Sequence, residues 1–181
     1  SGGELIDGLA GGMCQIASTL HAAAFFAGLE IVRSTPHSRP SAYIPMGLDS
    51  TVVYPSVDLK LRNPYDFPVI IHYVVNQGSV KVELLGKQQP YHAAFEREIL
   101  SETAFPTTTR QDPEMPAGQK ITDQEGYPGY RIKRRRYLFT GKWKLDPKNE
   151  NRPKPDVLIG KKEWDISYPA TALIIRVGSG P

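Results

Sequence analysis

Residues 14–29 are the best helix candidate in this sequence, and no other feature constrains the fold as strongly. Small and apolar side chains recur there at helical spacing, at Ile16, Leu20, Ala23, Ala24 and Ala27. Gly28 suits the end of this helix. The segments that follow have the pattern of strands. We therefore predict an α+β fold, in which an N-terminal helix packs on an antiparallel sheet and a small β-rich domain follows.

Short strands are expected through the rest of the chain. In the first half they fall at residues 29–32, 51–54 and 57–61, followed by a hairpin of residues 68–75 and 79–85 around the turn Asn76-Gln77-Gly78. In the second half they fall at residues 96–103, 119–123, 130–139 and 172–177. Residues 1–12 and 146–155 are predicted to be loops. A polar run near residues 86–91 divides the chain into two predicted domains, residues 1–90 and 91–181.

The single cysteine among 181 residues restricts the available chemistry. One thiol cannot form an internal disulfide, and four scattered histidines with one cysteine lack the spacing of a structural zinc site. We therefore expect no metal and no cofactor. No run reaches the roughly 18 apolar residues of a membrane helix, and no segment resembles a signal peptide. A net charge of +3 does not by itself indicate a nucleic-acid partner.

Cys14 follows the glycine pair Gly11-Gly12 and lies at the predicted helix start. Two glycines let the backbone turn tightly and approach a substrate closely. The unpaired N–H groups and the dipole at a helix start favour a thiolate, and the same N–H groups can stabilise an oxyanion during acyl transfer. The arrangement is analogous to that of papain-like and NlpC-type cysteine peptidases. Spacing alone leaves two interpretations open, a catalytic nucleophile and a buried structural thiol.

A thiol nucleophile needs a base within about 3 Å. His21 lies about 10.5 Å from Cys14 along the helix axis, so it is either a cleft residue or a half-buried helix histidine. His37 lies in the proline-stiffened segment Thr35-Pro36-His37-Ser38-Arg39-Pro40 and is the preferred base. Asp49 is a candidate to orient that base by accepting an imidazole N–H, with a turn aspartate as the alternative.

The run Gly11-Gly12-Met13-Cys14-Gln15-Ile16-Ala17-Ser18-Thr19-Leu20 resembles the signature of the VanW family. The resemblance continues through residues 27–31, Pro36-His37-Ser38 and Tyr43-Ile44-Pro45, and it covers roughly residues 4–90. The sequence departs from the family pattern where His21 and Ala22 replace a usual tyrosine and a common asparagine, and where Leu48 replaces a frequent arginine. These departures retain Cys14 and His37 and concern substrate contacts.

The resemblance implies an extracytoplasmic enzyme that acts on peptidoglycan stem peptides, with its signal or anchor segment outside this chain. It implies an L,D-transpeptidase-like reaction in which Cys14 forms a thioester, with His37 as base and Asp49 as its orienting group. Six further residues are expected to bind substrate: Gly12, Gln15, His21, Ser38, Arg39 and Tyr43. A cysteine peptidase and a non-catalytic wall-binding module are the alternatives.

Residues 118–136 resemble the five-glycine cell-wall domain, on the run Glu125-Gly126-Tyr127-Pro128-Gly129-Tyr130 and the basic residues after it. The resemblance implies that glycan strands are a further partner. We interpret the basic residues within positions 131–136 as a solvated strand face, with binding of carboxylates or anionic wall polymers as the alternative. Nucleic acid is not expected as a partner, because the patch is short and lacks an aromatic stacking platform.

Overall fold

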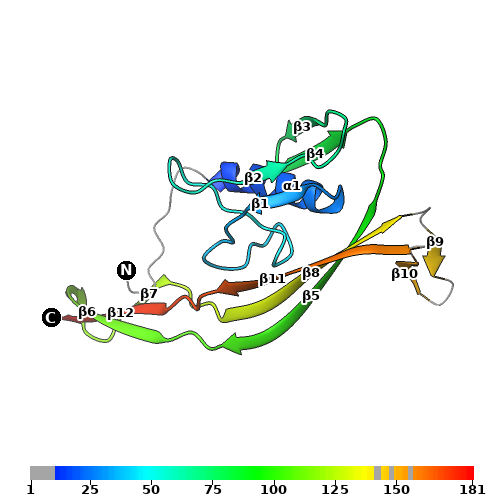
Figure 1. Ribbon diagram of the computed structural model, residues 1–181. Helices are drawn as coiled ribbons and strands as arrows, with labels where there is room; N and C mark the ends of the chain where they lie inside the picture. Colours follow the sequence, from blue (N-terminus) through cyan, green and yellow to red (C-terminus); the bar gives the residue numbers. More distant parts are fainter. Residues whose placement is uncertain (1–10, 141–143, 147–148, 155–156) are drawn as a thin grey trace.

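The computed structural model describes residues 11–140, 144–146, 149–154 and 157–181. The chain is mostly β, with 55% strand and about 10% helix, so the predicted α+β architecture is wrong. The elements in chain order are α1 (Gly11–Phe26), β1 (Glu30–Arg33), β2 (Lys60–Arg62), β3 (Ile70–Asn76), β4 (Ser79–Leu85), β5 (His92–Thr103), β6 (Thr107–Pro116), β7 (Lys120–Gln124), β8 (Gly129–Thr140), β9 (Lys144–Asp146), β10 (Asn149–Lys154), β11 (Val157–Tyr168) and β12 (Leu173–Gly180) (Figure 1).

The prediction of one sheet beneath the helix fails because the strands pair in small groups. Near α1, β1 pairs with β2 and β3 pairs with β4, each as a two-stranded antiparallel sheet. Further along the chain, β5, β8 and β11 form an antiparallel sheet with β8 in the centre. A second three-stranded sheet has β12 between β6 and β7, with β12 parallel to β6, and β9 pairs with β10. The helix therefore lies among several small sheets (Figure 1).

Helix α1 begins three residues earlier than predicted and ends at Phe26. Gly28 closes it with a φ of 76°, the left-handed conformation that glycine adopts without a steric penalty. Two backbone bonds complete this cap, from Gly28 N–H to the Phe25 carbonyl and from Leu29 N–H to the Ala24 carbonyl. The predicted loop of residues 1–12 is wrong at positions 11–12, which are helical, and its other residues lie outside the described part of the chain.

The β3–β4 hairpin confirms the prediction for residues 68–85, with Gly78 in the left-handed conformation at its turn. The strands predicted at residues 51–54 and 57–61 are shorter in the structure. There, an isolated bridge pairs Val53 with Val57 around the cis Tyr54–Pro55 peptide bond, and β2 begins at Lys60. The proline occupies the position where a continuous strand would need a backbone N–H.

Four strands of the second half were not predicted: β6, β9, β10 and β11. Strand β6 contains Pro113 and ends at Pro116, and its place at the edge of its sheet tolerates the missing N–H groups. Residues 146–155 were predicted to be a loop, but residue 146 belongs to β9 and residues 149–154 form β10, so the prediction is wrong there. Positions 147–148 and 155 lie outside the described residues. No helix within the described ranges is long and apolar enough to cross a membrane.

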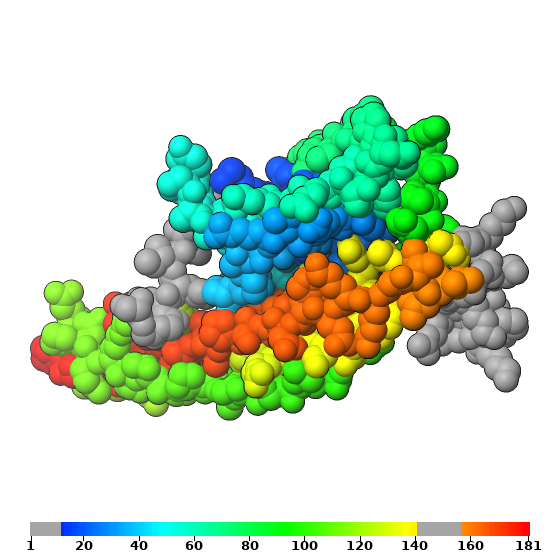
Figure 2. Space-filling view, in the orientation of Figure 1, coloured from blue at the N-terminus to red at the C-terminus, as the bar shows by residue number. Residues whose placement is uncertain are grey.

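The first half of the chain is seated on the β5–β8–β11 sheet, as Figure 2 shows for the blue and cyan residues above the yellow and orange strands. Phe25 of α1 is fully buried and lies 5.8 Å from the ring of Phe95 on β5 and 6.0 Å from that of Trp164 on β11. Such aromatic contacts supply much of the apolar area that a small core buries. The two halves therefore share one buried interface.

The basic strand β8 contributes two buried arginines to this interface, so the predicted solvated face is wrong at these positions. Arg134 and Arg136 are 2% and 6% exposed. Arg136 donates to the Leu29 carbonyl at 2.7 Å and to the Phe25 carbonyl at 3.4 Å, which places a cation at the C-terminal end of α1. Arg135, on the other face, pairs with three glutamates, Glu96, Glu98 and Glu163.

Candidate functional site

Asp49 is the most completely hydrogen-bonded group of the candidate site. Its buried carboxylate accepts the backbone N–H of His37 at 2.8 Å and the His37 Nδ1–H at 2.9 Å through Oδ2. Its Oδ1 accepts the Tyr168 hydroxyl at 2.5 Å and the Gly47 N–H at 3.2 Å. Burial disfavours the charged form, but the hydrogen bonds from His37 and Tyr168 outweigh it and hold the pKa of Asp49 below its ordinary value. Asp49 is therefore a carboxylate across the neutral range.

This contact determines the orientation of the His37 ring. Because the carboxylate only accepts, Nδ1 carries the ring proton when His37 is neutral, and Nε2 is left with a lone pair. Nε2 accepts the Tyr43 hydroxyl at 3.2 Å on the exposed side of the ring. The structure thus brings together three of the predicted residues, Asp49, His37 and Tyr43, as a chain of hydrogen bonds that ends at the surface.

Cys14 lies in the first turn of α1, close to the segment that follows Asp49. It is partly exposed, and its thiol donates to the Val52 carbonyl at 3.6 Å. The Thr51 N–H donates to the Thr35 carbonyl at 2.7 Å, so the segments that carry Val52 and His37 run side by side. Within the described residues no hydrogen bond joins Cys14 to His37. Catalytic contacts are often long in a ligand-free enzyme, so the role of the pair stays a prediction.

The other predicted substrate residues surround this region unequally. Gly12 is exposed, and among the described residues a Cβ at this position would meet no atom within 4 Å. Gln15 is partly buried on α1, while Ser38 and Arg39 are exposed beside His37. The Arg39 guanidinium lies 4.7 Å from the centroid of the Tyr127 ring, a contact with the second half of the chain.

His21 is separated from the surface. Its side chain is fully buried, its Nδ1–H donates to the Leu48 carbonyl at 2.7 Å, and its Nε2 accepts from Arg134 at 3.2 Å. Burial, together with the nearby Arg134 charge, lowers the pKa of His21 to about 4. In this structure His21 therefore contacts the Asp49 loop and β8, and it has no exposed surface for a substrate.

The buried, neutral His21 predicts an acid-sensitive fold. Its folded pKa of about 4 lies below the ordinary value of 6.5, so its stabilising effect is complete above pH 6.5 and is lost as the pH falls toward 4. The free energy of unfolding should fall by roughly 3 kcal/mol over this window. We expect His21→Gln to flatten the pH dependence of the free energy of unfolding, measured by urea denaturation at a series of pH values. Equal slopes for wild type and His21→Gln would contradict this assignment.

Two residues that hold the site were not found from the sequence, Tyr168 and Arg134. Tyr168 ends β11 and is 2% exposed, and its hydroxyl contacts both Asp49 and the Gly47 N–H. Arg134 donates to the Gly47 carbonyl at 2.7 Å. These partners are separated from Asp49 and Gly47 by 119 and 87 positions, and no local motif in the sequence marks them.

A groove of about 690 Å³ lies beside Cys14. Its walls include Met13 and Ala17 from α1, Val52, the exposed ring of Tyr54, and Tyr73 from β3. The lining is mainly apolar, with Asp58 as its acidic member. Cys14 is not in this lining, but its neighbour Met13 is, and so is Val52, whose carbonyl accepts the Cys14 thiol.

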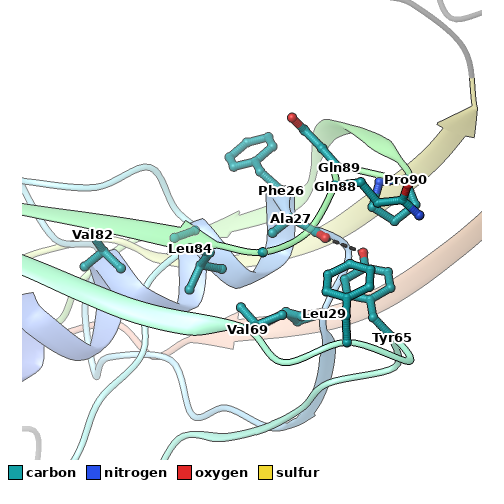
Figure 3. Close-up of a pocket in the computed structure, with 13 residues that line it drawn as sticks. Phe26, Ala27, Leu29, Tyr65, Val69, Val82, Leu84, Gln88, Gln89 and Pro90 are labelled. Atoms are coloured by element: carbon teal, nitrogen blue, oxygen red, sulfur yellow. Dashed lines mark hydrogen bonds between the residues drawn. The ribbon is translucent and has the colours of Figure 1, made fainter.

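A second cavity, of about 290 Å³, lies at the other end of α1 against the β3–β4 hairpin (Figure 3). On its wall the rings of Tyr65 and Phe67 stack 5.1 Å apart, and the Tyr65 hydroxyl points at the Ala27 carbonyl, to which it donates at 2.5 Å (Figure 3). None of the predicted catalytic residues lines this cavity. Across the described residues no three His, Cys, Asp or Glu side chains are grouped to hold a metal ion.

Comparison with known families gives one match in each half of the chain. Residues 1–85 match the family model described as "VanW like protein", and residues 96–142 match the model of the G5 domain. The chain therefore has a segment similar to VanW-like proteins, followed by a segment similar to the G5 domain. Both domain types are typical of extracellular cell-wall proteins, and together they indicate a cell-wall-related function. The predicted division near residue 90 lies between the two matched ranges and stays a prediction.

One relative is the Bacillus subtilis (strain 168) protein described as "Uncharacterized protein YoaR". It is 40% identical over 82 residues, which are 45% of this chain and 27% of that protein, so the chain corresponds to about a quarter of the relative's length. Among solved structures, "IgA1 Protease G5 domain structure" is similar at 12% identity and a TM-score of 0.27, over 50% of this chain and 94% of that one.

Proposed function

We propose that this VanW-like and G5 protein is an extracytoplasmic cysteine acyltransferase of the L,D-transpeptidase type. The observation that carries the proposal is the Asp49–His37 hydrogen bond, which leaves Nε2 as the basic atom of the His37 ring, at the exposed position where it accepts the Tyr43 hydroxyl in the ligand-free protein. That arrangement is what a base needs in order to accept a proton from a thiol. Cys14, in the first turn of α1, supplies the thiol, and the groove beside it supplies a surface for the donor peptide.

The proposed reaction has two steps. His37 accepts the Cys14 proton, and the thiolate attacks the carbonyl carbon of a meso-diaminopimelate residue in a tetrapeptide stem. The amide bond to the terminal D-alanine breaks, D-alanine leaves with a proton from His37, and a thioester remains on Cys14. The side-chain amine of a second stem then attacks the thioester, forms a 3→3 cross-link and returns the thiol. Attack by water instead would make the protein a peptidase.

The start of α1 has a defined part in this chemistry. Its unpaired N–H groups carry the positive end of the helix dipole, which stabilises both the thiolate and the oxyanion of the tetrahedral intermediate. The open space at Gly12 allows the donor carbonyl to approach that backbone. We propose that the G5 domain adds affinity for the glycan strands that carry the stem peptides.

A second function is favoured by one observation, the hydrogen bond from the Cys14 thiol to the Val52 carbonyl. A structural cysteine makes this kind of contact with a backbone carbonyl. In a wall-binding module Cys14 would have this structural role alone. On this alternative the groove and the G5 domain bind peptidoglycan, and no covalent intermediate forms.

Incubation of the full chain with purified muropeptides tests the two functions against each other. We expect the intact mass of the wild-type protein to increase by one stem peptide less D-alanine, and cross-linked dimers to appear among the products. Cys14→Ala should give neither product, since it removes only the sulfur. Release of D-alanine without dimers would identify a peptidase. If no adduct forms while wild type and Cys14→Ala bind cell walls equally, the enzyme is excluded and the binding module stands.

A further inference from the structure

The loop that carries Asp49 is held by the second half of the chain through Gly47. The Gly47 N–H donates to the Tyr168 hydroxyl at 2.7 Å, and the Gly47 carbonyl accepts from Arg134 at 2.7 Å. Both polar backbone groups of this residue are therefore bound to side chains from the β5–β8–β11 sheet. The Tyr168 hydroxyl then donates its own proton to Asp49 at 2.5 Å.

The fit at Gly47 is close as well as polar. Gly47 has a φ of 90°, and a Cβ there would lie 3.2 Å from Ile132 Cδ1 and 3.5 Å from Arg134 Cδ. A side chain at this position would be strained by its backbone and would press on β8. The loop thus packs closely against β8 at a position that favours a residue without a side chain.

From this geometry we propose that Tyr168 and Arg134 are positioning residues for the Asp49–His37 pair. The proposal rests on the function proposed above, and it makes the site complete only when the strands after the VanW-like domain are folded against it. Neither residue contacts the reacting atoms. Tyr168 acts on the Asp49 carboxylate directly, and Arg134 acts on the backbone two residues before it.

The division of hydrogen bonds on Asp49 explains why a hydroxyl is needed at Tyr168. Oδ2 faces His37, whereas Oδ1 faces Tyr168 and Gly47, so the Tyr168 bond stops the carboxylate from rotating away from the imidazole. Burial, and then the neighbouring charge of Asp49, raises the pKa of Tyr168 above its ordinary value. Tyr168 is therefore a protonated donor at every pH at which the protein works.

Tyr168→Phe removes this donor and keeps the ring, and Tyr130→Phe is its matched control. Tyr130 lies directly opposite Tyr168 in the β8–β11 ladder, and the structure gives its hydroxyl no contact with Asp49. With the full chain, we expect the Asp49 titration followed by carboxyl ¹³C NMR to move up by about one to two pH units in Tyr168→Phe, because a hydrogen bond to a charged group is lost. Tyr130→Phe should match the wild type.

A second NMR signal reports the imidazole itself. The His37 Nδ1–H should exchange with water about tenfold faster in Tyr168→Phe. This rate corresponds to a weakening of the His37–Asp49 hydrogen bond by roughly 1.4 kcal/mol once Tyr168 no longer fixes the carboxylate. A residue that only stabilised the fold would lower the melting temperature without moving either signal. An unchanged Asp49 titration in folded Tyr168→Phe would overturn the proposal.

A second variant, which keeps both the ring and the hydroxyl at position 168, tests the proposal if Tyr168→Phe does not fold. Fluorotyrosine placed at position 168 is a stronger donor than tyrosine, so the Asp49 titration should move down. No movement would again overturn the proposal. These measurements do not depend on turnover: if the NMR shifts appear while muropeptides give no adduct, the positioning stands and the acyltransferase does not. If both hold, Tyr168→Phe should lower kcat and leave KM unchanged.

Discussion

Replacing Asp49 with asparagine should lower the rate of thioester formation on Cys14 by about 10²- to 10⁴-fold while the chain stays folded. Two donors of His37 converge on one carboxylate oxygen, and the amide oxygen of asparagine can take that place. The ring therefore keeps its acceptor, but the imidazolium that forms when it accepts the thiol proton loses its negative partner. The amide nitrogen that replaces Oδ1 also cannot accept from Tyr168 and Gly47. Loss of one member of a buried charge pair costs about 3 to 5 kcal/mol, and each 1.4 kcal/mol is a factor of ten in rate.

Asp165→Asn is the matched control for this variant. Asp165 is exposed on β11 and is not among the residues that line the groove. We expect it to change the rate by less than threefold, because a surface substitution outside the site has little effect. The measurement is the initial rate of the Cys14 adduct by mass spectrometry, with circular dichroism to compare folding. A wild-type rate in Asp49→Asn would remove His37 from the role of base.

Arg134→Ala should lower the free energy of unfolding by about 3 to 5 kcal/mol, because it removes a buried, hydrogen-bonded arginine. The variant leaves the Gly47 carbonyl and His21 Nε2 without their donor in a buried place. It also removes a guanidinium that lies 4.2 Å from the centroid of the Trp164 ring. Burial lowers the pKa of Arg134 to about 10, so the side chain is still charged at neutral pH and these contacts are those of a cation.

Arg131→Ala is the control, since Arg131 lies on the same strand with its side chain exposed. Its effect should stay within about 0.5 kcal/mol. For a chain of this length the loss in Arg134→Ala corresponds to a melting temperature roughly 10 °C lower in a calorimetric scan. Similar melting temperatures for the two variants would show that the buried arginine contributes no more than a solvated one.

Local patterns predicted local elements well. The helix was placed within three residues at each end because small and apolar residues recur at its spacing, and its cap was placed by Gly28. The β3–β4 hairpin followed from Gly78 between two apolar runs. The fold class was wrong because the number of strands and their pairing depend on contacts across the chain. Strand β6 was missed because its prolines argue against a strand unless its place at a sheet edge is known.

The candidate site divides in the same way. His37 and Asp49 were named from short motifs, and the structure places them in hydrogen-bonding contact, while their catalytic role stays a prediction. His21 was considered both as a cleft residue and as a packing residue, and its burial follows from Arg134, 113 positions away. Tyr168 stands at the end of a strand with no motif around it. Residues of this kind are found only when the folded chain shows what they contact.

The hydrogen bonds from Arg134 of β8 and Tyr168 of β11 to Gly47 bear on how this chain could be divided in a gene fusion. A gene fusion that joined residues 1–90 to an unrelated partner would separate the Asp49 loop from Arg134 and Tyr168, although it would keep every residue of the VanW-like match. If Tyr168 and Arg134 position the Asp49–His37 pair as proposed, a working chimera has to include β8 and β11 or supply an arginine and a tyrosine in equivalent places. On that proposal the unit that can be transplanted is longer than the family match and ends no earlier than β11.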